Sequence, residues 1–386
     1  MTAPIPKSDG PVRVLVLRGV DGAGGGADEI ILRTAANVSR ERIEMKLCFF
    51  RHRDDNEFTF EGRSRELGLE YCDIKHSGAF DLSVLPRLRA VISDFNPSVV
   101  HSHDYKANFF NRAVARRNKH KTLATSHGWT GHGFVERFIY YPCDRRILRK
   151  FDRVIGVSNE IRDTLISSGV QSDKVSVLLN GIDPADYQPS PEIRNRVRRD
   201  LGIDETDVVI GAVGRVERQK RFDLTLIAFA EIQKNVPNAQ LLIAGEGSLK
   251  REIESQILNM GLQHCCRMLG HCPDMRETYQ AFDVLVQSSD YEGTPTVVVE
   301  AMALGIPVVA TDAGGTAQLA FPNEHALIVP CGDTSAIAAA VMQSIQNRDQ
   351  TQSRIAAARQ RAETELTFSN RTEQLTAIYE SLARST

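Results

Sequence analysis

The chain has 386 residues, of which 42% are hydrophobic and 25% are charged, and its formal net charge is −2. This length and composition are typical of a globular protein with two domains rather than one. The near-neutral charge excludes a general polyanion binder, so we expect no nucleic-acid partner.

No hydrophobic run approaches the roughly 18 residues that a membrane-spanning helix requires. The first ten residues lack the apolar core of a signal peptide. Seven cysteines occur without paired C-x-x-C spacing, which favours free thiols in a reducing compartment, so we expect a cytoplasmic protein. Adjacent Cys265 and Cys266 would point to opposite faces of a strand, and a zinc site there is not expected.

Short β-branched and apolar runs alternate with amphipathic stretches along the whole chain. This alternation predicts parallel strands connected by helices, that is, an α/β fold with helices on both faces of each sheet. The predicted strands of the first half span residues 12–17, 45–50, 69–74, 98–101, 121–125, 153–157 and 175–178. Those of the second half span residues 208–213, 240–244, 267–269, 284–287, 307–310 and 327–329.

The alternation breaks once, at residues 183–199, where three prolines precede a charged run. We interpret this stretch as a linker followed by the start of a second unit. The predicted domains are residues 1–188 and 189–370, each doubly wound, followed by a helix over about residues 371–386. Two such domains facing each other would place a ligand in the cleft between the carboxyl ends of their strands.

The first motif in chain order is the glycine-rich loop at residues 21–27. Glycine lets backbone N–H groups approach an anion closely, and the N-terminus of the following helix attracts negative charge, so Gly25 and Gly26 are candidate phosphate contacts. The loop also satisfies the dinucleotide pattern G-x-G-x-x-A, and the second strand runs into Arg51-His52-Arg53, where an arginine would suit the 2′-phosphate of NADP. An NADP-dependent oxidoreductase therefore stays open as an alternative.

Histidines end two further strands of the first half. His127 follows the fifth predicted strand, and His101 and His103 end the fourth, at the edge where α/β proteins build their sites. A single histidine is commonly a hydrogen-bonded structural residue. Ligand contact and a structural role both stay open for His127, and a structural role is favoured for the other two.

Residues 112–121 and 134–150 mix basic and aromatic side chains. One interpretation is a pair of solvated helices that cover the sheet. The other is a surface that rests on anionic lipid while the protein reaches a lipid-linked acceptor, peripheral to the inner face of a membrane. Pro142 and Cys143 are expected to interrupt a long amphipathic helix, which counts against the second interpretation.

Two cations follow the first strand of the second half. Arg215 and Lys220 could hold an anionic group such as a diphosphate, although such residues are often ordinary surface cations. Glu246 lies in a Gly-Glu-Gly turn after the next strand and is a weaker candidate. Glu292 lies in a loop, and Glu300 lies within an apolar helical run where an unpaired carboxylate would be costly.

The segment from Glu292 onward resembles the donor-binding core of the retaining glycosyltransferases of family 4, also called glycosyl transferases group 1. The shared features are two glutamates separated by seven residues, an A-M-A-x-G-x-P-V-V-A stretch and a Gly-Gly turn, here Glu292, Glu300, residues 301–310 and Gly314-Gly315. Arg215 and Lys220 are similar to the family's G-R-x4-K element. The family's glycine after the lysine is Arg221 here, so the turn is expected to differ.

The resemblance implies two Rossmann-like domains of GT-B type, with the nucleotide held by the second and the last helix packed back on the first. It also implies roles for individual residues. Those implied in donor binding are Gly25, Gly26, Arg215, Lys220, Glu246, Glu292, Gly293, Thr294, Pro295 and Glu300. Those implied in catalysis are Glu292, His127, Arg215 and Lys220.

By resemblance, the reaction moves a hexose-type sugar from a nucleotide diphosphate donor to a glycan, lipid-linked or small-molecule acceptor, with retention at the anomeric carbon. The chain contains no D-x-D motif, so no metal and no cofactor are expected. A sugar-nucleotide epimerase, or a binding protein of the same fold, stays open beside the oxidoreductase.

Overall fold

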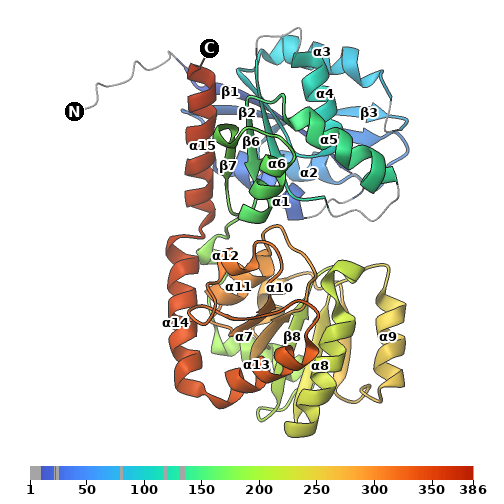
Figure 1. The fold of residues 1–386 in the computed structure, drawn as a ribbon, viewed down its shortest axis with the longest axis vertical. Coiled ribbons are helices and arrows are strands. Elements are labelled where there is room, and N and C mark those ends of the chain that lie inside the picture. The colour runs from blue at the N-terminus through green and yellow to red at the C-terminus, as the bar shows by residue number, and fades with distance from the viewer. Residues whose placement is uncertain are drawn as a thin grey trace, which may run out of the picture. The chain divides into compact units, whose positions relative to one another are not determined.

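A computed structural model describes residues 10–20, 22, 26–78, 81–115, 120–129 and 135–385 (Figure 1). The chain forms two compact units, each built on one parallel sheet with helices on both faces. Unit 1 consists of Met1–Leu178 and Ser369–Thr386, and unit 2 of Leu179–Phe368. The predicted α/β class with two doubly wound sheets is confirmed.

Unit 1 contains a seven-stranded sheet in the order β3-β2-β1-β4-β5-β6-β7. Its strands are β1 Val12–Gly19, β2 Ile43–His52, β3 Glu70–His76, β4 Val99–Ser102, β5 Lys121–Ser126, β6 Arg153–Gly156 and β7 Val175–Val177. β1 pairs with both β2 and β4, so the order of connection reverses beside β1. Such a switch point separates the loops that follow the strands and opens space for a ligand.

Alternate residues of β1 pack on opposite faces of this sheet. Val14 and Val16 share a core cluster with residues of α1 (Gly26–Asn37) and α15 (Phe368–Arg384). Leu15 and Leu17 belong to a second cluster, with residues of α3 (Val84–Phe95) and α4 (Tyr105–Ala115). Because helices cover both faces, the strand is a continuous apolar run rather than an alternating one.

The remaining helices of unit 1 are α2 Phe60–Glu66, a π-helical turn Glu136–Tyr140, α5 Tyr141–Leu148, α6 Asn159–Ser167 and a 3-10 turn Ser172–Lys174. The chain is helical without a break from residue 135 to residue 148, so the prediction that Pro142 interrupts this helix is wrong. The π-helical turn changes the hydrogen-bond register just before Pro142. Pro142 therefore lies in the first turn of α5, where a helix tolerates a residue that has no backbone N–H.

The C-terminal helix α15 completes the core of unit 1 (Figure 1). Leu375 and Tyr379 lie in the same cluster as one face of β1. Arg42 pairs with Glu373 at 2.7 Å and with Glu380 at 2.9 Å. Burying one large apolar side chain contributes about 1.5–3 kcal/mol, so unit 1 depends on this helix for stability.

Unit 2 contains a six-stranded sheet in the order β10-β9-β8-β11-β12-β13. Its strands are β8 Val208–Val213, β9 Ala239–Ala244, β10 Cys266–Gly270, β11 Val284–Gln287, β12 Val308–Thr311 and β13 Leu327–Val329. Its α-helices are α7 Pro191–Asp200, α8 Phe222–Asn235, α9 Lys250–Asn259, α10 Met275–Tyr279, α11 Thr296–Ala303, α12 Thr316–Leu319, α13 Thr334–Gln346 and α14 Arg348–Thr364. Within the described ranges, neither unit has a helix whose length and hydropathy would let it cross a bilayer.

The boundary between the units lies between Leu178 and Leu179, not after residue 188 as predicted. The proline-containing stretch is not a free linker. The N–H of Ile182 donates to Leu366, and its carbonyl accepts from Phe368, so the start and the end of unit 2 are joined by backbone hydrogen bonds. These long-range contacts draw the stretch into unit 2, which local composition could not reveal.

Candidate functional site

The loops of unit 2 gather most of the predicted site residues at one edge of its sheet. Arg215 and Lys220 follow β8, Glu246 follows β9, and Glu292 follows β11. Glu300 lies in α11, the helix that begins after the β11 loop. Because all six strands are parallel, these loops share the edge formed by the carboxyl ends of the strands.

Lys220 and Glu292 form an ion pair across two of these loops. The Nζ of Lys220 lies 2.6 Å from the Oε1 of Glu292, and the side chains are only 14% and 8% exposed. Ser289 Oγ donates to the same oxygen at 2.7 Å, and Gln287 Nε2 at 3.3 Å. Two charges withdrawn from water require this degree of pairing, and removing one partner leaves the other as an unpaired buried charge. The two predicted residues therefore act as one group.

This ion pair keeps unused hydrogen-bonding capacity on both partners. All three donors to Glu292 reach Oε1, and no described residue donates to Oε2. Lys220 carries three N–H donors, of which Glu292 engages one. The pair can thus accept from a hydroxyl and donate to a phosphate at the same time.

The turn that carries Lys220 is a 3-10 turn, Arg218–Lys220, and Arg221 follows it in the left-handed region at φ 50°. A residue with a Cβ pays about 1–2 kcal/mol for this conformation, which glycine adopts freely. Arg221 recovers part of this cost through ion pairs with Asp223 and Asp290, each at 3.0 Å. The side chain at this position therefore joins the β8 loop to the β11 loop.

Further hydrogen bonds hold these two loops together. The N–H of Asp290 donates to the carbonyl of Gln219 at 3.0 Å, and Gln219 Nε2 donates to the carbonyl of Tyr291 at 2.8 Å. Ser288 Oγ donates to the carbonyl of Lys220 at 2.8 Å. The sequence did not indicate a role for these residues, because their partners lie far away along the chain and no local pattern marks them.

Glu300 is held by a tyrosine that the sequence did not indicate. The hydroxyl of Tyr279, at the end of α10, donates to Glu300 Oε2 at 2.6 Å. Burial raises the pKa of Tyr279 well above its ordinary value, so the hydroxyl stays protonated and remains a donor. Tyr279 therefore fixes the carboxylate of Glu300 on the side of α11 that faces α10.

Gly293, Thr294 and Pro295 connect Glu292 to the first turn of α11. Pro295 is the N-cap residue, with φ −70° and ψ 100°. The first N–H groups of a helix lack intrahelical partners and attract anions. The N–H of Gly315, in the turn after β12, donates to the carbonyl of Glu292 at 3.3 Å, so a third loop supports this connection.

Arg215 and Glu246 lie at the same edge in more open surroundings. Arg215 is exposed and forms no ion pair within the described part of the chain. Glu246 pairs with Lys250 at 2.8 Å, which lowers the pKa of the Glu246 carboxyl. A Cβ on Gly245 would lie 1.9 Å from the carbonyl oxygen of Gly214, so this glycine is required by close packing of two loops. Ligand binding is not needed to explain the Gly-Glu-Gly turn.

In unit 1, His127 after β5 meets His103 after β4. His127 Nε2 and His103 Nδ1 lie 3.2 Å apart. Burial lowers the pKa of His127 to about 3, with Arg18 and Arg371 acting in the same direction. Burial also lowers the pKa of His103 well below its ordinary value. Both rings are neutral near pH 7, so His127 can offer a ligand a polar contact but no positive charge.

His101 has the structural role that was favoured for it. Its ring is fully buried, with Nδ1 2.7 Å from the Tyr379 hydroxyl and Nε2 2.8 Å from Thr125 Oγ1. The imidazole thereby links β4 to β5 and to α15. Burial lowers the pKa of His101 well below its ordinary value, so this ring is neutral as well.

The glycine-rich loop is only partly described, and Gly25 lies outside the described residues. Gly26 is the first residue of α1, and Asp28 in the same turn pairs with Arg18 at 2.6 Å. Of the two arginines that could contact an NADP phosphate, Arg53 has its Nε 3.6 Å from Asp54, and Arg51 has its Nε 2.6 Å from Asp73 on the neighbouring strand. This pairing within the sheet counts against the oxidoreductase alternative.

Across the residues with described positions, no cluster of three or more His, Cys, Asp or Glu side chains is arranged to hold a metal ion. Cys265 and Cys266 are core residues of unit 2. Burial raises the pKa of the Cys266 thiol to about 12, so it stays protonated.

Two family models match the chain. The model described as "Glycosyltransferase Family 4" matches residues 24–186, and the one described as "Glycosyl transferases group 1" matches residues 193–361. The putative glycosyltransferase EpsD of Bacillus subtilis is 28% identical, covering 71% of this chain and 76% of that protein. The lipopolysaccharide core biosynthesis mannosyltransferase LpsB of Rhizobium meliloti is 27% identical, covering 62% of this chain and 68% of that protein.

Among solved structures, Anabaena Alr3699/HepE in complex with UDP has a TM-score of 0.83 to this chain at 19% identity. The alignment covers 96% of this chain and 100% of that one. At this identity the likeness shows a shared fold and nothing finer.

The buried neutral histidines predict that unit 1 loses stability in acid. In the unfolded chain each imidazole takes up a proton near its ordinary pKa of about 6.5, whereas His101, His103 and His127 stay neutral when folded. The unfolded state therefore binds more protons below pH 6.5, and stability falls with falling pH. Between pH 7.5 and 5.5 we expect each histidine to lower the free energy of unfolding by about 1 kcal/mol, measured by urea denaturation with Trp129 as fluorescent reporter.

The variant His127→Gln is the control for this pH dependence, because glutamine is polar but does not titrate. Its loss of stability over the same pH range should be smaller by about 1 kcal/mol. An unchanged loss would assign the acid sensitivity to other groups.

The positive φ of Arg221 predicts that glycine is more stable than alanine at this position, the reverse of their usual order. Arg221→Ala and Arg221→Gly lose the same ion pairs, but only alanine retains the steric cost of the left-handed conformation. We expect Arg221→Gly to be more stable than Arg221→Ala by about 0.5–1 kcal/mol in urea denaturation. At Arg218, whose φ is not positive, alanine should be the more stable replacement. The same ranking at both positions would contradict the assigned backbone conformation.

Proposed function

The chain belongs to the family 4 glycosyltransferases that these two models describe, and we propose that it transfers a hexose-type sugar from a nucleotide diphosphate donor to an acceptor hydroxyl. The observation that carries this proposal is the grouping of Lys220, Glu292 and Glu300 on adjacent elements at one edge of the unit 2 sheet. A nucleotide sugar presents phosphates and two sets of hydroxyls. An ammonium group suits the phosphates, and carboxylates suit the hydroxyls.

We assign Lys220 and Arg215 to the diphosphate of the donor. When the bond between the anomeric carbon and the phosphate oxygen breaks, negative charge accumulates on the leaving diphosphate. Lys220 is fixed by its ion pair with Glu292 and is largely shielded from water, so its charge acts through a medium that screens little. Arg215 is exposed and adds a second cation without the same fixed geometry.

We assign the hydroxyls of the donor to the two glutamates. Glu292 Oε2, which no described residue engages, is suited to accept from a hydroxyl of the transferred sugar. Glu300, oriented by Tyr279, is suited to accept from the ribose hydroxyls. Gly293, Thr294 and the N-terminus of α11 provide backbone N–H groups for the same ligand. His127 is proposed as a further neutral contact to the sugar, and Gly25, Gly26 and Glu246 as secondary donor contacts.

The proposed route retains the configuration of the anomeric carbon. The bond from this carbon to the phosphate oxygen breaks, the acceptor oxygen bonds to the same face, and the leaving phosphate takes the acceptor proton. Lysine and arginine offset the charge of the diphosphate in this scheme, so the proposal includes no metal ion and no cofactor.

We propose uridine as the first base to test and a glycan or lipid-linked molecule as the acceptor class. The solved structure of Alr3699/HepE contains UDP, and the name of LpsB places that relative in lipopolysaccharide core biosynthesis. Both points describe the relatives and serve here only to choose substrates for the experiments.

Donor binding is tested by a thermal-shift panel with UDP, GDP, ADP, CMP and NADP. A nucleotide present at 100 times its dissociation constant adds about 2.7 kcal/mol to stability. We expect a shift with one nucleoside diphosphate and a much smaller shift in Glu300→Ala, since that variant lacks the ribose acceptor. The exposed Glu254→Ala on α9 is the matched control and should keep the full shift. A shift with NADP alone would contradict the transferase assignment.

The role of Lys220 is tested by steady-state kinetics with the donor identified in that panel. Lys220→Ala should reduce kcat about 10²–10³-fold, because a charge aimed at the leaving group acts mainly in the transition state. Lys234→Ala, an exposed lysine at the end of α8, should leave kcat unchanged. The product of the unaltered protein should keep the anomeric configuration of the donor by NMR. An inverted product would overturn retention, and release of an epimerised nucleotide sugar would identify an epimerase.

A further inference from the structure

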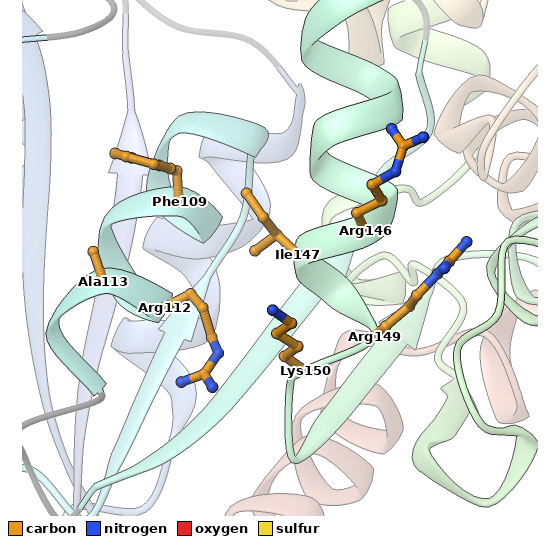
Figure 2. A pocket seen from close by; sticks show the side chains of 7 residues that line it. All are labelled: Phe109, Arg112, Ala113, Arg146, Ile147, Arg149 and Lys150. Carbon is orange, nitrogen blue, oxygen red and sulfur yellow. The ribbon is translucent and has the colours of Figure 1, made fainter.

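Unit 1 carries a basic pocket between α4 and α5 (Figure 2), which we call the α4–α5 pocket. It has a volume of about 470 Å³. Phe109 and Ala113 of α4 and Ile147 of α5 supply its apolar part, and its charged part consists of Arg112, Arg146, Arg149 and Lys150. Figure 2 shows Arg112 and Lys150 extending into the space between the two helices.

The four cations of the pocket have no counter-charge within the described part of the chain. No carboxylate lies within ion-pairing distance of them, and α4 contains no acidic residue. The acid of α5, Asp144, is buried and accepts hydrogen bonds from Asn108 at 2.8 Å and Trp129 at 3.0 Å. Burial raises the pKa of the Asp144 carboxyl to about 6, so the group is mostly ionised at pH 7, but its charge is engaged by these two donors and by none of the four pocket cations.

The helix that forms one wall of the pocket is amphipathic on its exposed side. Asp144 and Leu148, four residues apart, are buried against the sheet. The exposed positions Cys143 and Arg146 are three residues apart and lie on one stripe of α5, and the exposed Arg149 and Lys150 follow directly after the helix ends at Leu148.

Large apolar side chains are exposed at the start of this helix. Val135, Phe138 and Ile139 are 46%, 58% and 48% exposed. Phe109 of α4, in the pocket wall, is 39% exposed. Exposed apolar residues gathered on one segment indicate a contact surface rather than ordinary surface variation.

We propose that this face of unit 1 docks on a membrane that contains anionic lipid. A lipid phosphate occupies the α4–α5 pocket, while Phe138 and Ile139 enter the boundary between headgroups and acyl chains. The basic residues match the anionic headgroups of a lipid surface, and the exposed aromatic and aliphatic residues beside them match its acyl layer. A soluble phosphate would use the cations but not the exposed apolar side chains. The inference does not depend on the proposed transfer reaction.

Vesicle flotation with the full chain tests the proposal. We expect binding to phosphatidylcholine vesicles that contain one-third phosphatidylglycerol, and little binding to pure phosphatidylcholine. Raising the ionic strength should weaken the binding, because surface charge is screened. Arg146→Gln and Lys150→Gln should each reduce partitioning about fivefold, which is the usual contribution of one basic residue at an anionic surface.

The apolar part is tested separately with the double variant Phe138→Ser and Ile139→Ser, which should reduce partitioning about tenfold at any ionic strength. The matched controls, Arg251→Gln and Leu258→Ser, replace an exposed cation and an exposed leucine of α9 in unit 2 and should leave partitioning unchanged. A retained nucleotide-induced thermal shift, or an unchanged urea midpoint, shows that each variant is folded.

Three results would overturn the proposal. Equal binding to neutral and anionic vesicles would remove the role of the cations. Unchanged binding in the variants of Arg146, Lys150, Phe138 and Ile139 would place the contact elsewhere. A thermal shift with inorganic phosphate that Lys150→Gln abolishes, without vesicle binding, would identify the pocket as a site for a soluble phosphorylated ligand.

Discussion

Parallel strand pairing is the constraint on which the rest of this structure depends. A parallel strand needs a crossover back to its start, so each strand is followed by a helix and both faces of the sheet become covered. The core clusters around β1 show the result, with neighbouring residues of one strand buried on opposite faces. The same constraint places the loops after β8, β9, β11 and β12 at one edge, which is why residues distant in sequence can form the Lys220–Glu292 pair.

The two units manage buried polarity in different ways. In unit 2 the nearly buried carboxylate of Glu292 is paired with Lys220, and two neutral donors contact the same oxygen. In unit 1 the imidazoles of His101, His103 and His127 lie near Arg371 and stay neutral, because a further positive charge would be both desolvated and repelled. The first arrangement holds a charge ready for a ligand. The second provides only uncharged polar contact.

The fold was predictable from the sequence because its strands are short β-branched runs buried on both faces, and all thirteen predicted strands have a counterpart in the structure. The glutamate pair and the cation motif were also visible, because their spacing is local. Tyr279, Ser289 and Gln219 were not, since their roles arise from contacts between loops far apart in the chain. Pro142 and the domain boundary near Leu178 were predicted wrongly, because in both places the prolines suggested a break in the structure. At Pro142 the helix continues because a π-helical turn changes its hydrogen-bond register. After Leu178 the proline-containing stretch belongs to unit 2 because backbone hydrogen bonds join it to the end of that unit.

The helix α15 has a consequence for how the chain acquires its structure during synthesis. Unit 2 is continuous in sequence, whereas unit 1 lacks Leu375, Tyr379 and the partner of His101 until the last part of the chain leaves the ribosome. The usual order, in which the N-terminal domain folds first, is therefore reversed here. One face of the N-terminal sheet stays only partly covered while the nearly two hundred residues of unit 2 are translated, and chaperones can bind the exposed apolar surface during this period.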